Sequence, residues 1–395
     1  MGKVATESTL REGVDLLKSI AANGIPRLLT YADIRRAIRA GFGSVYFDIG
    51  DQISTPYRAD DGKTYQAPWD VKHIDDTGVY FGMHYAVPEE MVFDAPEAIY
   101  AVKEELAAGT YHITVGEKYG KGWQQGQNIQ FTIAKPVPAG GEVYIDFGAN
   151  YDLDPTSGRK VETYATAGIL EALETTTTSP GSGGANLGTM VAAKTTGNLN
   201  SISRCVSGYN RYAQSAIRQW LNSSAGADGW WKPQNEWDRP PTSRYLKKPG
   251  FLSRLPSDFI DMMDKVEVVT AIRTTESVEL DRDTTLDKVF LPSIQNLCVT
   301  PQLADAEAPV WDYYKQLAQE AGLTEFAQWK PYEIMQHYRL NSSPGRLSPC
   351  VVRLRSANRT TSSGAWYIYA NGTAGTDTVQ LPYMCCPACK VKKIK

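Results

Sequence analysis

The cysteines near the C-terminal end are the residues whose type and spacing could most directly carry chemistry. Cys385, Cys386 and Cys389 lie close together, and the last two form a Cys-x-x-Cys pair. One such pair without a second supplies only half of a tetrahedral zinc site. A soft metal such as copper would need thiolates that converge in an open pocket. Because the three cysteines fall in an expected closing strand of a chain made in the cytoplasm, we expect reduced, structural thiols and no metal.

The histidines offer a second kind of chemistry. His73, His84 and His112 fall in stretches that read as strands, and strands can bring distant histidines together at a metal. No closely spaced His, Asp or Glu supports that arrangement in this sequence. No Ser-His-Asp set or pair of carboxylates stands out either, and His337 is the one histidine in the last 200 or so residues. We therefore expect a protein that is not an enzyme and that has no cofactor.

The C-terminal part has the composition of a recognition surface. Between Glu333 and Lys390 there is no Lys and no Glu, and Ser, Thr, Asn, Gly and Tyr are common. Antibody combining sites share this composition, because Tyr and Trp give rigid contact area while Ser, Asn and Gly give adaptable hydrogen bonds. An ordinary β-rich C-terminus with a Ser- and Thr-rich solvent side is the alternative that composition leaves open.

Length and charge limit the class of protein. A chain of 395 residues exceeds one ordinary core and predicts about two or three domains. The net charge of -3 lacks the basic excess of a nucleic-acid binder. No apolar run is long enough to span a membrane, and the first residues lack the apolar core of a signal peptide. We expect no nucleic-acid partner and no membrane insertion.

Local signals predict helices at the start of the chain. Residues 8–22 have the pattern of an amphipathic helix, and Thr30 with Asp33 predicts the start of a second helix. Ile34, Ala37 and Ile38 would form its apolar face, and Gly41 would end it.

Strand signals follow from residue 44 onward. Residues 44–53, 78–85, 109–115, 129–133 and 142–147 are rich in β-branched and aromatic side chains. Turn signals at 60–62 and 76–78 separate the first of them, and this spacing is typical of an antiparallel β-sandwich. We expect an α+β, multi-domain protein with a helical anchoring or oligomerisation segment (1–43), a jelly-roll-like β-sandwich module (44–175), a linker (176–194) and a final domain (195–395).

Three phrases in the C-terminal half carry a resemblance to a known family. They are Asn210-Arg-Tyr-Ala-Gln-Ser-Ala-Ile-Arg-Gln-Trp-Leu-Asn222, Trp231-Lys-Pro-Gln-Asn-Glu-Trp-Asp-Arg-Pro-Pro241 through Leu252, and Val352-Arg-Leu-Arg-Ser-Ala-Asn-Arg359 with Trp366 and Pro387-Ala-Cys389. In this order they resemble virion proteins of phages and prophages of Gram-positive gut bacteria. The resemblance covers most of the chain. It implies that the final domain has a C-type-lectin-like fold of the formylglycine-generating-enzyme-like branch, a compact scaffold that holds irregular loops.

The resemblance also implies an origin for the polar C-terminal segment. In relatives, a diversity-generating retroelement mutates adenines in codons, which yields Asn, Tyr, Ser, Thr, Gly, Ala, Asp, Ile or Val but not Lys, Glu, Gln, Met or Trp. On this interpretation Trp366, Gln380 and Met384 are fixed scaffold positions. Arg353 and Arg355 would make structural ion pairs with Asp238 or Asp287. The residues expected to face a ligand are Asn358, Thr360, Thr361, Ser362, Ser363, Tyr367, Tyr369, Asn371, Thr373, Thr376, Asp377, Thr378 and Tyr383.

The resemblance implies a virion surface protein that binds a bacterial surface protein or glycan for host attachment. Its N-terminal parts would contact other virion proteins and hold it in a homo-oligomer such as a trimer, where several weak sites give avidity. The alternative is a purely structural capsid decoration or fibre protein without receptor binding. A third class is an enzyme, because the same fold branch includes a copper-dependent, cysteine-using oxidase.

Overall fold

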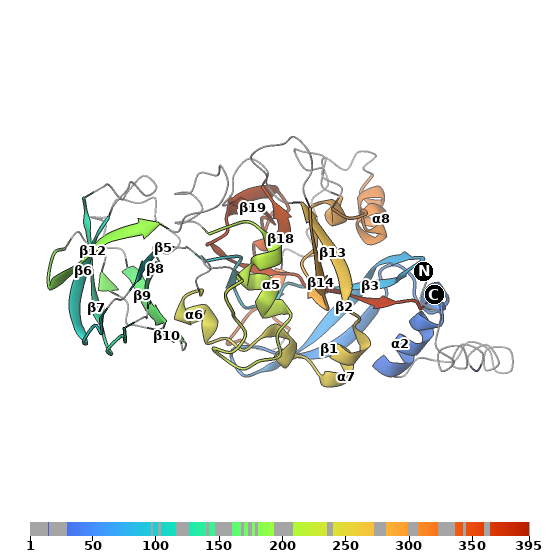
Figure 1. The fold of residues 1–395 in the computed structure, drawn as a ribbon. Helices are drawn as coiled ribbons and strands as arrows, with labels where there is room; N and C mark the ends of the chain where they lie inside the picture. Colours follow the sequence, from blue (N-terminus) through green and yellow to red (C-terminus); the bar gives the residue numbers. More distant parts are fainter. Residues whose placement is uncertain are drawn as a thin grey trace.

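The computed structural model is an α+β protein with a central body and a separate β-sheet at one end (Figure 1). Short helices and mostly antiparallel strands in several small sheets agree with the predicted α+β class. None of the helices in the part of the chain that the structure describes is long and apolar enough to cross a membrane. The described residues are 15, 30–95, 98–101, 104–115, 126–139, 142–146, 160–166, 170–172, 176–177, 181–192, 208–234, 240–271, 282–298, 307–322, 336–342, 345–358 and 364–394.

Helix α2 (Tyr31–Arg39) begins where the sequence predicts it. The Thr30 hydroxyl accepts a hydrogen bond from the Asp33 backbone N–H at 3.1 Å, and the Asp33 carboxylate accepts one from the Thr30 N–H at 3.1 Å. This reciprocal capping box satisfies two N–H groups at the helix start. Ile34, Ala37 and Ile38 are buried, as predicted. Apart from residue 15, the expected helix of 8–22 lies outside the described residues.

One sheet joins strands from the two ends of the sequence. Its order is β1 (Gln52–Arg58), β2 (Thr64–Asp75), β3 (Gly78–Met83), β22 (Ala388–Lys392) and β15 (Val289–Phe290). Strand β22 runs antiparallel to β3, with Cys389 opposite Phe81. The predicted turns at 60–62 and 76–78 join β1 to β2 and β2 to β3. The strand expected to begin at residue 44 is wrong there, because the backbone N–H groups of Val45 and Tyr46 bond back to the Phe42 carbonyl and form the short helix α3 (Gly43–Tyr46).

A second sheet of the body carries several of the predicted ligand-facing residues. Its order is β20 (Ala374–Thr378), β19 (Gly364–Ile368), β18 (Val352–Ala357), β21 (Pro382–Cys385) and β4 (Met91–Val92). Strand β18 is buried along its whole length, whereas β20 is an edge strand of intermediate exposure. Within this sheet the buried β18 therefore lies beside β19, and the hairpin of β19 and β20 ends at the sheet edge.

Helices and two short strand pairs complete the body. One buried hydrophobic cluster runs from α2 to β22. The sequence also predicts helices over residues 214–222, 256–265 and 311–322, and these are present as α5, α7 and α8. The remaining elements of the body are η3 (Tyr212–Gln214), α5 (Ala216–Leu221), α6 (Ser243–Leu246), η4 (Phe251–Arg254), α7 (Ser257–Met262), β13 (Val266–Ala271), β14 (Arg282–Asp287), η5 (Gln295–Leu297), α8 (Asp312–Glu320), β16 (Gln336–Tyr338) and β17 (Leu347–Pro349).

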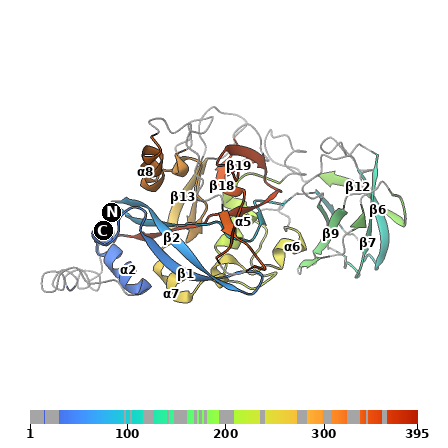
Figure 2. The same cartoon turned by 180° about the vertical axis from the view of Figure 1, so that it is seen from behind.

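The separate sheet is an insertion into the body. It contains β5 (Ala98–Ala101), β6 (Gly109–Val115), β7 (Asn128–Ile133), β8 (Glu142–Asp146), β9 (Lys160–Thr166), β10 (Leu170–Ala172), β11 (Thr176–Thr177) and β12 (Ala185–Ala192). Both views show it apart from β1–β3 and β18–β19 (Figures 1 and 2). Its two connections to the body meet, because the Tyr209 N–H donates to Asp94 Oδ2 at 3.0 Å. The two ends of an inserted domain must lie close together, as they do for this sheet.

The domain boundaries in the structure differ from those predicted from the sequence. The strands of the expected 44–175 module lie in more than one sheet, so that module is not one unit. The expected linker of 176–194 contains β12, which pairs with β6 and β5. The expected domain of 195–395 lacks β1–β4, although β3 and β4 pair with its last strands. Strand signals along the chain give the order of strands but not their partners, which explains these differences.

Candidate functional site

The hairpin of β19 and β20 places the predicted residues on two faces. Trp366 lies opposite Thr376 in the register. Because side chains alternate along a strand, Tyr367 and Asp377 lie on one face, and Trp366, Thr376 and Thr378 lie on the other. The two strands therefore present different surfaces above and below the sheet edge.

Three tyrosines gather on the first face. The Tyr367 ring centroid lies 4.6 Å from that of Tyr369 and 5.4 Å from that of Tyr383. The Tyr383 hydroxyl donates to Asp377 Oδ2 at 2.9 Å. Tyr369 is 44% exposed but Tyr367 only 3%, so the expected ligand-facing position of Tyr367 is wrong: its ring supports Tyr369. Burial raises the pKa of both Tyr367 and Tyr383, which keeps their hydroxyls protonated at neutral pH.

Arg353 lies buried beneath this group, which we call the tyrosine face (Tyr367, Tyr369, Asp377 and Tyr383). Its guanidinium donates to the carbonyls of Ala365 and Thr378, each at 3.0 Å. Two longer bonds of 3.3 Å reach the carbonyls of residues 377 and 381, and the cation lies 4.5 Å from the Tyr383 ring centroid. Burial lowers the pKa of Arg353 to about 10, which leaves it charged at neutral pH. Arg353 thus ties β18 to β19, to β20 and to the turn before β21.

Hydrogen bonds within the turn between β19 and β20 fix the tip of the hairpin. The Tyr369 N–H donates to the Thr373 carbonyl at 2.8 Å, and the Thr373 N–H donates to Asn371 Oδ1 at 3.0 Å. Gly372 adopts a φ of 78°, a left-handed conformation that glycine allows without steric cost. Asn371 and Thr373 are exposed. The turn therefore presents two polar side chains next to Tyr369 in a fixed arrangement.

The loop after β18 is clamped at its base. The Asn358 N–H donates to the Gly364 carbonyl at 2.8 Å, and Asn358 Nδ2 donates to Thr376 Oγ1 at 3.1 Å. Asn210 Nδ2 donates to the carbonyls of Asn358 and Gly364 at 3.1 and 2.7 Å. Asn210 is a positioning residue that sequence reasoning missed, because no local pattern in the sequence distinguishes it. Four expected contacts (Thr360, Thr361, Ser362 and Ser363) lie outside the described residues.

Arg355 points to a different part of the body than Arg353. Its guanidinium donates to the Leu291 carbonyl at 2.7 Å and to Asn296 Oδ1 at 3.1 Å. A third bond of 3.3 Å reaches the Val269 carbonyl of β13. Like Arg353, it therefore binds mainly backbone carbonyls, and it links β18 to β13 and to the segment from Leu291 to Asn296.

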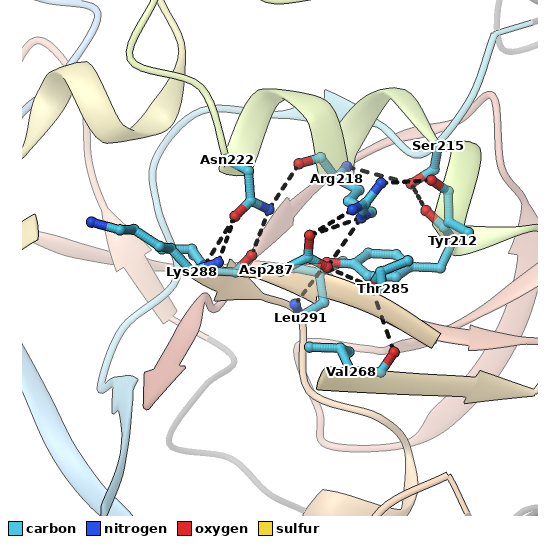
Figure 3. Close-up of polar contacts among 11 residues, drawn as sticks. Tyr212, Ser215, Arg218, Asn222, Val268, Thr285, Asp287, Lys288 and Leu291 are labelled. Carbon is cyan, nitrogen blue, oxygen red and sulfur yellow. Dashed lines mark hydrogen bonds and ion pairs between the residues drawn. The ribbon is translucent and has the colours of Figure 1, made fainter. Parts of the chain in front are cut away.

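The ion pair expected between these arginines and Asp287 is wrong. Asp287 instead accepts hydrogen bonds from Arg218 Nε at 2.9 and 3.0 Å and from Thr285 Oγ1 at 2.6 Å (Figure 3). Asn222, at the end of α5, accepts from the Lys288 N–H at 2.9 Å. Asp287 ends β14 beside α5, and this position puts Arg218 nearer than either arginine of β18. The other expected partner, Asp238, lies outside the described residues.

Residues 188–393 match a protein family described as Domain of unknown function (DUF6273). The match covers more than half of the 395 residues. The chain belongs to this family. Comparison with curated proteins and with solved structures gives no match.

The DUF6273 segment contains the whole tyrosine face together with Arg353 and Arg355. In space the folded body is larger than this segment. Strands β1–β4 precede it in sequence, and two of them pair with β21 and β22 near its end.

The positions expected to be scaffold are buried or half-buried in the DUF6273 segment. Trp366 and Met384 are half-buried and pack against the core, and Gln380 is buried. The thiols of Cys385, Cys386 and Cys389 are free and buried. Burial raises the pKa of all three, that of Cys386 to about 12. A protonated, inaccessible thiol is a poor nucleophile and a poor metal ligand.

The three histidines of the predicted strands have separate partners. His73 Nδ1 lies 2.7 Å from Asp312 Oδ2, and His84 Nδ1 lies 2.8 Å from Asp70 Oδ2. His112, in the inserted sheet, lies near the Gly183 carbonyl. Within the described residues, no group of three or more His, Cys, Asp or Glu side chains could hold a metal ion.

Proposed function

We propose that this protein is a phage virion surface protein whose C-terminal domain binds a bacterial surface protein or glycan without catalysing a reaction. The observation that supports this most is the exposed Tyr369 ring, which rests on Tyr367 above the buried Arg353. A ring that is held before binding loses little conformational entropy on association. It also offers both apolar contact and a hydroxyl group, which is why tyrosine is common in combining sites.

The proposed contact surface consists of Tyr369, Asn371 and Thr373, with Thr376 and Thr378 at its margin. The first three are exposed and the last two half-buried. An aromatic ring next to hydroxyl and amide groups suits a sugar ring, which has an apolar face and polar edges, and it equally suits the polar rim of a protein interface.

We further propose that the body has a C-type-lectin-like fold and that its contact surface is varied by a diversity-generating retroelement. The pairing of β3 with β22 and the exposed turn between β19 and β20, which are anchored on the buried β18, support the first part. The variation by a retroelement is supported by the residue types on the contact surface. Adenine mutation can produce Tyr, Asn and Thr, the types of the exposed Tyr369, Asn371 and Thr373. A near-copy of the DNA encoding about residues 355–389, differing at adenines and beside a reverse transcriptase gene, is expected; its absence would remove the diversification proposal.

The binding proposal is tested with the full chain, because β1–β4 complete the body. Purified protein would be applied to a glycan array and to surface-protein extracts of Gram-positive gut bacteria. We expect saturable binding that Tyr369→Ala weakens by about 30-fold, because loss of a central aromatic residue of an interface costs about 2 kcal/mol. Leu286→Ala, which truncates a side chain that is 55% exposed on β14, is the matched control. Equal binding by Tyr369→Ala and the parent chain would contradict the proposal.

The alternative proposal is a capsid decoration or fibre protein without receptor binding. The inserted sheet, which lies apart from the body, is the feature that favours it, because a separate unit can contact neighbouring subunits in a homo-oligomer (Figures 1 and 2). Imaging of intact particles separates the two. A tyrosine face covered by neighbouring virion proteins would support decoration, and a face directed outward would support host binding.

A further inference from the structure

A cleft with strong positive charge lies in the body and shares no lining residue with the tyrosine face. It has a volume of about 660 Å³ and lies between the turn joining β1 to β2 and the segment from α6 to η4. Pockets for small molecules commonly have volumes of about 300–1,000 Å³. The charged side chains that line it are Arg58, Asp60, Arg244, Lys247, Lys248 and Arg254. Five of the six are cationic.

The floor of the cleft is a fixed network. Arg254 is buried, and its Nη2 donates to Asp60 Oδ1 at 2.5 Å. Its Nη1 donates to Glu89 Oε1 at 3.0 Å, and the Tyr57 hydroxyl donates to the other oxygen of Glu89. Lys248 Nζ donates to Asp60 Oδ2 at 2.6 Å. Asp60 thus bridges two cations, which holds both at the base of the cleft.

Part of the positive charge on the rim has no carboxylate partner among the residues that the structure describes. Arg244 pairs with Glu90 at 2.9 Å. Arg58 and Lys247 are both exposed, and neither forms an ion pair within the described ranges of the chain. Two unpaired cations facing one cleft repel each other, and an anion between them would relieve that repulsion.

We propose that this cleft binds a dianionic phosphate group, held by Arg58 and Lys247 above the floor formed by Arg254, Asp60 and Lys248. A phosphate monoester carries up to about two negative charges, which balance the two positive charges of Arg58 and Lys247. A carboxylate carries one negative charge and would leave one of these cations uncompensated. The planar fork of Arg58 matches two phosphate oxygens, and Lys247 adds a mobile point charge. This inference is independent of the binding function proposed for the tyrosine face.

The test is a titration of the full chain at constant ionic strength with inorganic phosphate, glycerol phosphate and inorganic sulfate, followed by calorimetry. Constant ionic strength is needed because salt screens exposed charges. We expect saturable binding of inorganic phosphate or of glycerol phosphate. Tighter binding of inorganic phosphate would indicate a free phosphate as the ligand, and tighter binding of glycerol phosphate would indicate a phosphate ester. Tighter binding of sulfate than of either phosphate would overturn the assignment, as would a response to all three that does not saturate.

Matched double variants test the residues. Arg58→Ala with Lys247→Ala is expected to weaken phosphate binding by at least tenfold without changing the circular dichroism spectrum, because both side chains are exposed. Arg282→Ala with Lys265→Ala removes one exposed Arg and one exposed Lys elsewhere and is expected to leave binding unchanged. Equal phosphate binding by the first double variant and the parent chain would overturn the proposal. Tyr369→Ala should keep phosphate binding, which separates this site from the tyrosine face.

Discussion

The segment that matches DUF6273, residues 188–393, is predicted not to fold when it is produced alone. It retains β21 and β22 but loses β4 and β3, the strands that pair with them. It also leaves the buried Lys390 without Asp75, whose carboxylate oxygens both lie 3.2 Å from Nζ. The fragment would have unpaired strand edges and a buried cation without its partner.

The expected loss of folding stability follows from the buried side chains that the fragment would lack. Eight large side chains of β1–β4 are at most 1% exposed in the full chain: Tyr57, Tyr65, Trp69, Val71, Val79, Phe81, Met83 and Met91. Full burial of one such side chain contributes about 1.5–3 kcal/mol, so removing all eight costs at least about 12 kcal/mol of stability. The free energy of unfolding of a whole domain is about 5–15 kcal/mol, and a loss of this size is enough to unfold the fragment.

The assay compares two deletions. Fragment 188–393 is expected to bind the dye ANS and to show no cooperative thermal transition. In the second chain a short Gly-Ser linker replaces residues 96–207, which removes the inserted sheet. Gly208 lies against the carbonyls of Asp94 and Ala95, so a few residues can span the gap, and this chain is expected to unfold cooperatively. A cooperative transition of fragment 188–393 in urea would refute the reasoning.

Two further predictions concern titration and thiol access. Burial acts to raise the pKa of Asp75, but hydrogen bonds from Thr77 and the charge of Lys390 outweigh it and hold that pKa below its usual value. The resulting stability is present above the unfolded pKa of about 3.9 and is lost as pH falls through the folded pKa. The difference in free energy of unfolding between the parent chain and Asp75→Asn, measured in urea, should therefore shrink between about pH 7 and pH 3; an equal difference at both would contradict this. Cys385, Cys386 and Cys389 should react with an alkylating reagent only after unfolding, as peptide mass spectrometry can show, and labelling in the native chain would contradict their burial.

Much of the local structure could be predicted from the sequence. The capping box of Thr30 and Asp33, the buried face of α2 and the turn at 60–62 depend on residues only a few positions apart. The helix near 214–222 could be predicted for the same reason, because its apolar spacing is a local property. The depletion of Lys and Glu before Lys390 likewise marked the segment that holds the exposed turn between β19 and β20.

The partners of the strands and the roles of single side chains were decided by the tertiary structure. Every strand edge offers the same N–H and C=O groups, so no local pattern could show that β3 pairs with β22, about 300 residues away, or that 96–207 is an insertion. Tyr367 and Tyr369 look equivalent in sequence, yet one is buried and the other exposed because β19 ends at Ile368, between them. The cationic cleft combines residues from 58–62 and 244–254, and only folding brings them together. The sequence by itself determined which segments could form helices, strands and a polar surface, whereas long-range packing determined which side chains reach solvent.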